Sequence, residues 1–159
     1  MLYQKILYHS EVGPITLLTN QHYIRKIEFG KSTLDPQAVW SEEQPVIQET
    51  CRQLNEYFHG MRRQFSLPMN PEGTSFQKAV WAQLLRIPFG QTRTYGQLAQ
   101  ELQRPGAARA VGNACHNNPI AIVIPCHRVI GAGGSLTGYA GGLAVKEYLL
   151  SLERPIDRA

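Results

Sequence analysis

A cysteine followed by a histidine carries the clearest potential chemistry in this sequence. Cys126 and His127 come directly after Pro125, at the end of the apolar run 120–124. A cysteine thiolate is a strong nucleophile, and near neutral pH it forms only beside a base or a positive charge. If the run is a strand that continues through the pair, the two side chains point to opposite faces. Either the chain turns here or a water bridges thiol and imidazole; an unreactive buried cysteine beside a structural histidine is the alternative.

Metal and nucleotide chemistry fit the sequence poorly. The pairs Cys115-His116 and Cys126-His127 lack the C-x₂₋₄-C and H-x₃₋₅-H spacings typical of structural zinc. On a helix, neighbours such as Cys115 and His116 diverge by about 100°. The sequence has no GxxxxGKS/T motif, and no GxGxxG motif follows a predicted strand. We therefore expect no metal and no cofactor, and we expect the glycine-rich segment 131–142 to be a flexible loop that closes over Cys126.

Helices are expected to position this pair in the second half of the chain. Thr74 with Gln77, and Thr94 with Gln97, have the spacing of capping boxes, so each threonine predicts the start of a helix. Proline and glycine together end both helices, at 88–90 and at 104–106. Three further elements are predicted: a helix over 107–117, a strand over 120–124 and a helix over about 143–153.

The helix that starts at Thr94 and the helix over 107–117 match a helix-turn-helix, because a turn of about three residues containing glycine joins them. A helical projection divides the second helix into two sides. One side holds Ala107, Val111, Ala114 and Cys115, and the outward side holds Arg109, Gly112, Asn113 and His116. Small residues let this backbone approach a docking partner closely. A nucleic acid is the favoured partner, and an ordinary alanine-rich packed helix is the alternative.

The first half of the chain has the pattern of a small α/β domain. Three short strands over 3–9, 15–19 and 23–29, with tight turns between them, predict an antiparallel meander. Residues 30–41 are predicted to be a loop. A helix should follow, since Ile47, Cys51, Leu54 and Phe58 form one apolar stripe, ended by Gly60. The segment 66–73 contains two prolines and a glycine, so we place the linker there, with domains over 1–73 and 74–159.

Composition restricts the class of protein. The 159 residues, 43% of them hydrophobic, suffice for one domain or two small ones with a core. No run of about 18 apolar residues occurs, so we expect no membrane span. The first residues do not resemble a signal peptide, which predicts a cytoplasmic protein. Three cysteines, an odd number, do not form a disulfide scaffold and are expected to be reduced.

The two halves differ in charge. Residues 1–73 contain seven basic and eight acidic residues, whereas residues 74–159 contain nine basic and four acidic ones. This asymmetry indicates an anionic partner for the second half, most commonly a nucleic acid. A moderately basic enzyme without such a partner is the alternative.

Several motifs together resemble one known family. PCHRVIG is preceded by NNPIAIVI and followed by TGYAGGLAVKEYLL, and the resemblance extends to FG-x₃-TYGQLA and RPGAARAVG. This pattern is similar to the O6-alkylguanine-DNA alkyltransferases, densely over residues 74–153 and only in layout before them. The resemblance implies a ribonuclease-H-like α/β N-terminal domain and a winged-helix-like C-terminal domain. It also implies a monomer that flips an alkylated guanine out of double-stranded DNA and transfers the alkyl group to its own cysteine.

The resemblance also implies roles for single residues in the reaction. Cys126 accepts the alkyl group, His127 acts through a water as the base, and Glu153 orients His127. Asn118 holds the turn of the active site, and a Tyr95 hydroxyl suits protonation of the leaving guanine. A thioether is stable, so each molecule would react once. Activity on O4-alkylthymine and the range of alkyl groups are left open.

Pocket and DNA contacts follow from the same resemblance. The base pocket is expected to include Tyr95, Tyr139 and Val129, and the DNA contacts are expected to be Arg109, Gly96, Arg104 and Asn113. Arg109 would fill the gap that the flipped base leaves in the duplex. The family has Ser or Ala after the pocket tyrosine, and here it is Ala140, so a serine hydrogen bond to the base is missing. Relatives with an N-terminal zinc site use cysteines and histidines that this N-terminal half does not match.

Two other function classes remain as alternatives. A DNA-binding module could recognise damage without transfer, but relatives of that kind replace the cysteine that is present here as Cys126. A cysteine hydrolase would need its Cys-His pair on a different fold, and the basic second half would then have no purpose.

Overall fold

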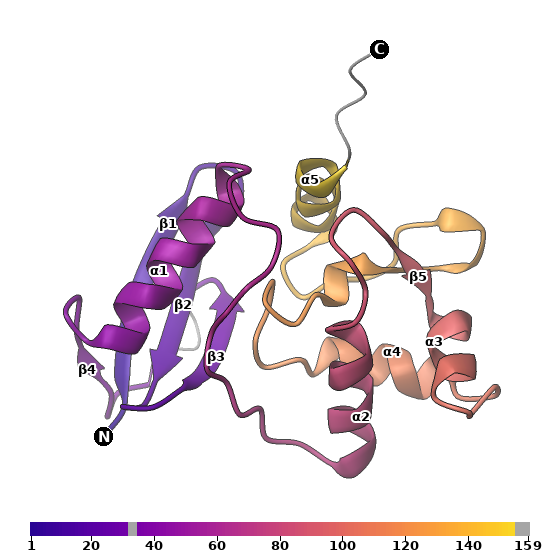
Figure 1. Ribbon diagram of the computed structural model, residues 1–159, viewed down its shortest axis with the longest axis horizontal. Coiled ribbons are helices and arrows are strands. Elements are labelled where there is room, and N and C mark those ends of the chain that lie inside the picture. The colour runs from indigo at the N-terminus through magenta and orange to yellow at the C-terminus, as the bar shows by residue number, and fades with distance from the viewer. Residues whose placement is uncertain (32–34, 155–159) are drawn as a thin grey trace. The chain divides into compact units, whose positions relative to one another are not determined.

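A computed structural model of the chain describes residues 1–31 and 35–154 (Figure 1). The chain divides into two compact units, and each is described by itself. The first contains Met1–Glu72 together with Pro119–Ala121, and the second contains Gly73–Asn118 and the chain from Ile122 onward. Sequence patterns placed the linker at 66–73 and gave no sign that three residues of the second half group with the first.

The first unit contains a four-stranded sheet in the order β3-β2-β1-β4. Its strands are β1 (Tyr3–His9), β2 (Gly13–Thr19), β3 (Ile24–Phe29) and β4 (Val39–Trp40). The predicted antiparallel meander of β1, β2 and β3 is confirmed, while β4 adds a parallel partner to β1. It lies inside the segment 30–41 that was expected to be a loop. The rest of that prediction falls partly on residues 32–34, which lie outside the described residues.

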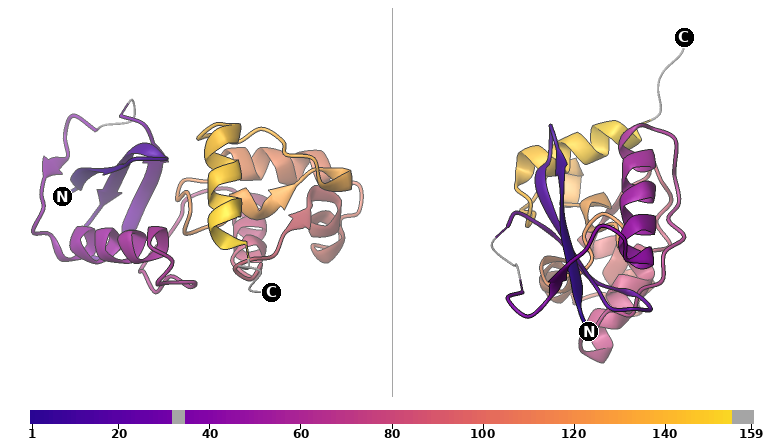
Figure 2. Two further views of the ribbon diagram at one scale, coloured as in Figure 1. Left: turned by 90° about the horizontal axis from the view of Figure 1, so that it is seen from above. Right: turned by 90° about the vertical axis from the view of Figure 1, so that its left-hand side faces the viewer.

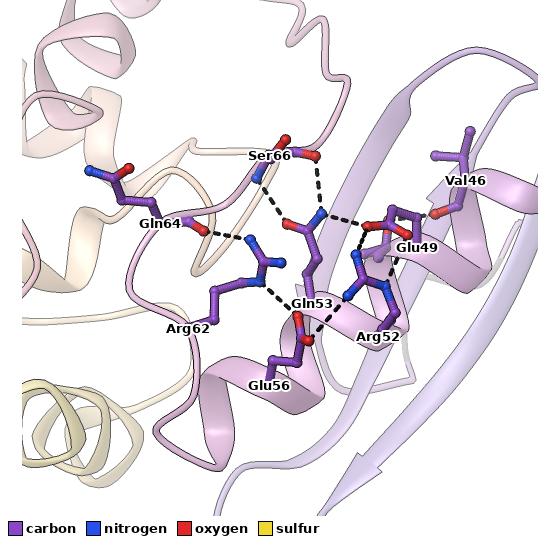
Figure 3. A network of polar contacts seen from close by, with 9 residues as sticks. Val46, Glu49, Arg52, Gln53, Glu56, Arg62, Gln64 and Ser66 are labelled. Carbon is purple, nitrogen blue, oxygen red and sulfur yellow. Dashed lines mark hydrogen bonds and ion pairs between the residues drawn. The ribbon is translucent and has the colours of Figure 1, made fainter.

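Helix α1 (Pro45–Phe58) covers one face of this sheet, as both views of Figure 2 show. Ile47 and Leu54 of the predicted stripe are fully buried, but Cys51 is only half-buried. The side chain of Gln53 is buried instead. It accepts a hydrogen bond from the Ser66 amide at 2.9 Å and donates one to the Ser66 carbonyl at 3.1 Å (Figure 3). This pair of bonds fixes the segment after α1 against the helix.

The second unit is mainly helical. Its helices are α2 (Ser75–Leu84), α3 (Tyr95–Glu101), α4 (Ala108–His116) and α5 (Leu143–Glu153). Both predicted capping boxes are present, at Thr74 with Gln77 and at Thr94 with Gln97. Two short strands, β5 (Arg93–Thr94) and β6 (Val129–Ile130), pair in parallel. They join the start of α3 to the segment that follows the Cys-His pair.

The predicted strand over 120–124 is wrong. Ile120 forms one isolated bridge to Ile27, and the chain then runs through turns rather than an extended strand. Ile122 has a φ of 71°, in the left-handed region that a β-branched side chain adopts only as an outlier. The run is apolar because its side chains are buried, and burial alone does not distinguish a strand from a buried turn.

Candidate active site

Cys126 begins a 3₁₀ turn, Cys126–Arg128, so the chain turns at the Cys-His pair. Its amide donates to the carbonyl of Ile124 at 2.8 Å, and its side chain is 8% exposed. Asn118 holds this turn: its Nδ2 donates to the Ile124 carbonyl at 2.8 Å and to Cys126 Sγ at 3.2 Å. Burial raises the pKa of the Cys126 thiol, and hydrogen bonding by Asn118 and the positive charge of Lys146 act in the opposite direction.

His127 is fully buried and forms a hydrogen bond with Glu153. Its Nε2 lies 2.6 Å from Oε2 of Glu153, while its Nδ1 is buried with no hydrogen-bond partner among the described residues. Burial lowers the pKa of His127 and outweighs the opposing effect of Glu153. A carboxylate only accepts hydrogen bonds, so Nε2 carries the proton and Nδ1 is the ring atom able to accept one.

Glu153 is shared between His127 and Arg128. Nε and Nη2 of Arg128 donate to its two carboxylate oxygens at 2.7 and 3.1 Å, and Nη1 donates to the Ile87 carbonyl at 2.7 Å. Burial raises the pKa of Glu153, but the bonds and charges of His127 and Arg128 together lower it to about 2. The carboxylate is therefore ionised at neutral pH. Glu147, the other glutamate of α5, is exposed.

The buried face of α5 differs from the predicted one. We expected Ala144, Val145, Tyr148, Leu149 and Leu152 to face the core. The fully covered residues are instead Lys146, Leu149 and Glu153, and Ala144 is exposed. The difference arises because both charged side chains find partners inside the unit. Nζ of Lys146 donates to the Val129 carbonyl at 2.6 Å.

Sequence patterns missed Lys146 and Arg128 as members of this site. Lys146 is fully buried, and burial lowers its pKa while the two nearby cysteines Cys115 and Cys126 raise it. Charged residues are usually solvated, so a sequence pattern alone predicts both side chains at the surface. The available signal was the spacing i, i+3, i+7 of Lys146, Leu149 and Glu153, which places all three on one helix face.

A small cavity of about 30 Å³ opens beside Cys126. Its lining comes from α3, α4, the 3₁₀ turn and the glycine-rich loop: Tyr95, Gly112, Cys115, His116, Cys126, Gly138, Tyr139 and Ala140. The lining includes both tyrosines that were expected near Cys126, Tyr95 and Tyr139, and three residues of the glycine-rich loop. Val129 is not part of the lining, because its side chain is fully buried and its carbonyl accepts from Lys146. Burial raises the pKa of the neighbouring Cys115 thiol to about 12.

Helix α4 presents the polar face that its projection predicted. Val111, Ala114 and Cys115 are buried, and Arg109 and Asn113 are exposed. The indole of Trp81 in α2 donates to the Ala114 carbonyl at 2.9 Å and so anchors α4. Gly96 and Arg104 are also exposed, and the guanidinium of Arg104 lies 5.6 Å from the centre of the Phe76 ring.

The described residues contain neither a candidate metal site nor a membrane-spanning helix. Residues 1–31 and 35–154 contain no group of three or more His, Cys, Asp or Glu placed to hold a metal ion. Within the same ranges, no helix combines the length and hydrophobicity needed to span a membrane.

Comparison with known families covers both units. Residues 75–155 match the family model described as 6-O-methylguanine DNA methyltransferase, DNA binding domain. Residues 3–71 match the model described as the ribonuclease-like domain of the same methyltransferase. The chain belongs to the 6-O-methylguanine DNA methyltransferase family. It therefore joins a ribonuclease-like domain to a DNA-binding domain, as the family is built.

Individual members of the family are similar over nearly the whole chain. Proteins named methylated-DNA--protein-cysteine methyltransferase from Methanosarcina acetivorans and Methanosarcina barkeri are 48% and 50% identical. These matches cover 92% and 91% of this chain, and 96% and 92% of the relatives. A crystal structure of Mycobacterium tuberculosis OGT in complex with DNA superposes with a TM-score of 0.89 and 41% identity, covering 98% of this chain and 96% of that one.

Proposed function

We propose that this protein repairs DNA by transferring the alkyl group of O6-alkylguanine to Sγ of its own Cys126. The observation that carries the proposal is the position of the Cys126 thiol, which lines a cavity beside two tyrosines. The next residue, His127, is buried and forms a hydrogen bond with Glu153. The relatives named methylated-DNA--protein-cysteine methyltransferase support it. No cofactor enters the reaction, because the cysteine itself is the acceptor.

The reaction begins with a proton transfer. The thiol proton moves through one water to Nδ1 of His127, and the ionised Glu153 stabilises the imidazolium that forms. Burial raises the pKa of the Cys126 thiol and lowers the pKa of His127, so both groups are neutral at rest. The thiolate therefore forms only when the alkyl group is transferred. Asn118 and Lys146 stabilise its charge.

Alkyl transfer is then a displacement at an sp³ carbon. Sγ forms the new S–C bond as the C–O bond to guanine breaks, and the electron pair passes to the base. The Tyr95 hydroxyl donates a hydrogen bond to the leaving guanine and offsets this charge. The product is a thioether on Cys126, and none of the described residues around Cys126 could cleave it. Each molecule therefore acts once.

The base must leave the duplex to reach this thiol, because Cys126 is 8% exposed. A cavity of about 30 Å³ is on the scale of a single water molecule, so the pocket widens when the base enters. The loop residues Gly138, Tyr139 and Ala140 form one wall of it and are the part expected to move.

We further propose that α3 and α4 form the helix-turn-helix of a winged-helix-like domain, with α4 docked in the minor groove. Arg109 fills the gap in the stack, Asn113 lies beside it, and Gly96 and Arg104 lie near phosphates. The exposure of these residues and the basic second half support this arrangement, as does the structure of the mycobacterial relative in complex with DNA. Binding should weaken steeply with salt on unrelated duplexes alike, and a strong preference for one undamaged sequence would contradict it.

Intact-protein mass after incubation with an O6-methylguanine duplex tests the proposed function. Transfer predicts one added methyl group per molecule. A damage-recognising module without transfer predicts binding with no change of mass, and a cysteine hydrolase predicts neither. The domain division at 73, the monomeric state and the cytoplasmic location stay predictions.

A further inference from the structure

A chain of three polar side chains leads from a buried cation to the wall of the cavity. Oη of Tyr95 lies 2.7 Å from Oγ1 of Thr137. Nζ of Lys146 lies 3.5 Å from the same Oγ1 and 3.4 Å from the Thr137 carbonyl. A third bond, of 2.6 Å to the Val129 carbonyl, fixes the ammonium in place. In the proposed reaction Tyr95 acts on the guanine and Lys146 acts on the thiolate, while Thr137 has no role.

The direction of the bond between Tyr95 and Thr137 follows from the charge of Lys146. An ammonium only donates hydrogen bonds, and its field favours a hydroxyl that turns its oxygen toward it and its proton away. Thr137 then donates to Oη of Tyr95, and the Tyr95 proton is left to point elsewhere. With the bond reversed, the Thr137 proton would be free to face the ammonium, which is electrostatically unfavourable. Tyr95 lines the cavity, so its hydroxyl hydrogen, which is not used in the bond to Thr137, can point into the cavity.

We infer that Thr137 is a positioning residue that sets the Tyr95 hydroxyl as a hydrogen-bond donor toward the extruded guanine. The inference rests on the proposed function, since the guanine is the leaving group that receives this bond. Donor chains of this kind also strengthen each successive bond, because each hydroxyl is polarised by the one before. Thr137 thus prepares the site for the negative charge that develops on the base before any base has entered.

Thr137→Val tests this role, because it replaces the hydroxyl by a methyl group of similar shape. Lys146 keeps its bonds to the carbonyls of Val129 and Thr137, so the fold should persist. We expect single-turnover transfer from O6-methylguanine DNA to slow by about 10-fold, a small part of what a general acid contributes. Thr137→Ser should restore the rate, since it keeps the hydroxyl. Ser135→Ala removes an exposed hydroxyl from the same loop and should react like the unsubstituted protein.

A second alkylating reagent distinguishes an effect of Thr137 on the leaving group from an effect on the Cys126 thiol. Iodoacetamide alkylates a cysteine with iodide as leaving group, which needs no proton, so Thr137→Val should react with it at the unsubstituted rate. Equal slowing with both reagents would mean that Thr137 acts on Cys126 itself, and would overturn the inference. An unchanged rate with alkylguanine, or a Thr137→Ser variant as slow as Thr137→Val, would overturn it as well. If the unsubstituted protein transferred no alkyl group, the proposed function would fail instead.

The dependence on Tyr95 is tested by combining substitutions. If Thr137 acts through the Tyr95 hydroxyl, Thr137→Val should cause no further slowing in a Tyr95→Phe protein. A second loss of about 10-fold in that background would show an independent effect and contradict the inference.

Discussion

Replacing Glu153 by Gln removes one charge from the buried cluster and keeps its shape. The carboxylate accepts from Nε2 of His127 at 2.6 Å and from two nitrogens of Arg128 at 2.7 and 3.1 Å. An amide offers one acceptor and one donor in their place. If its NH₂ group faces His127, the imidazole tautomer reverses and Nδ1 no longer accepts a proton. In either orientation, the imidazolium loses its counter-charge.

Glu153→Gln should change both the rate of alkyl transfer and the stability of the fold. Loss of an adjacent opposite charge typically lowers a histidine pKa by about 1–3 units. Transfer at neutral pH should therefore slow by about 100-fold, because the thiol proton moves to His127 less favourably, and the rise of the rate that follows deprotonation of His127 should move to lower pH by about 2 units. In the unsubstituted protein, the pKa of Glu153 falls from 4.5 to about 2, which corresponds to about 3 kcal/mol of folding stability.

The sign of the stability effect follows from that lowered pKa. The contribution is complete above the unfolded pKa near 4.5 and is lost as the pH falls toward about 2. Glu153→Gln lacks it at every pH and leaves buried Arg128 without a counter-ion, so it should be less stable by about 3 kcal/mol at neutral pH. The difference from the unsubstituted protein should then shrink in acid.

Single-turnover rates across pH, together with urea unfolding from about pH 7 to about pH 3, measure both effects. Glu147→Gln is the matched control, because it makes the same change at an exposed position of α5 and should alter neither quantity. A Glu153→Gln protein with an unshifted rate profile, or a slowed Glu147→Gln protein, would refute the assignment of Glu153 as the partner of His127.

Three further substitutions address the thiol, the DNA and the buried cation. Asn118→Ala removes the donor to Cys126 Sγ, so the thiol pKa should rise and iodoacetamide should react more slowly at neutral pH; an unchanged rate would exclude Asn118 as a stabiliser of the thiolate. Arg109→Ala should slow repair of duplex DNA far more than reaction with free O6-benzylguanine, because only the duplex requires base flipping, and equal slowing would contradict its role in the stack. Lys146→Met leaves two carbonyls without their donor and should lower the unfolding free energy by about 2 kcal/mol, measured by urea denaturation; a loss below about 0.5 kcal/mol would contradict it.

Local sequence signals predicted the elements whose ends are set by nearby residues. The threonines at 74 and 94 begin α2 and α3 because each makes a reciprocal capping box with a glutamine three residues later. The limits of β1 and α5 also match the predicted ranges. In contrast, the two-residue strands β4, β5 and β6 exist only through pairing with distant segments, and their own sequences carry no periodicity.

The site divides in a similar way between local motifs and tertiary contacts. The Cys126-His127 pair is visible as a motif, and the family resemblance implied Glu153 as the partner of His127; the structure brings His127 and Glu153 into contact. The sequence does not predict Arg128 and Lys146 as members of the site, because a charged side chain is expected in solvent unless its partner is known. Their partners, Glu153 and the Val129 carbonyl, lie 25 and 17 residues away in the chain. The side chain of Val129 was expected to line the base pocket. It is fully buried instead, and the Val129 carbonyl accepts a hydrogen bond from Lys146.

Titration of O6-methylguanine DNA with the purified protein, followed by peptide mapping, shows whether Cys126 accepts the methyl group and how often each molecule reacts. We expect one protein molecule to remove one methyl group, repair then to stop, and the methyl group to be found on the peptide containing Cys126. Cys126→Ser should still bind the duplex and remove no methyl group. Transfer that persists in Cys126→Ser with the label on Cys51 or Cys115, or repeated turnover by the unsubstituted protein, would contradict it.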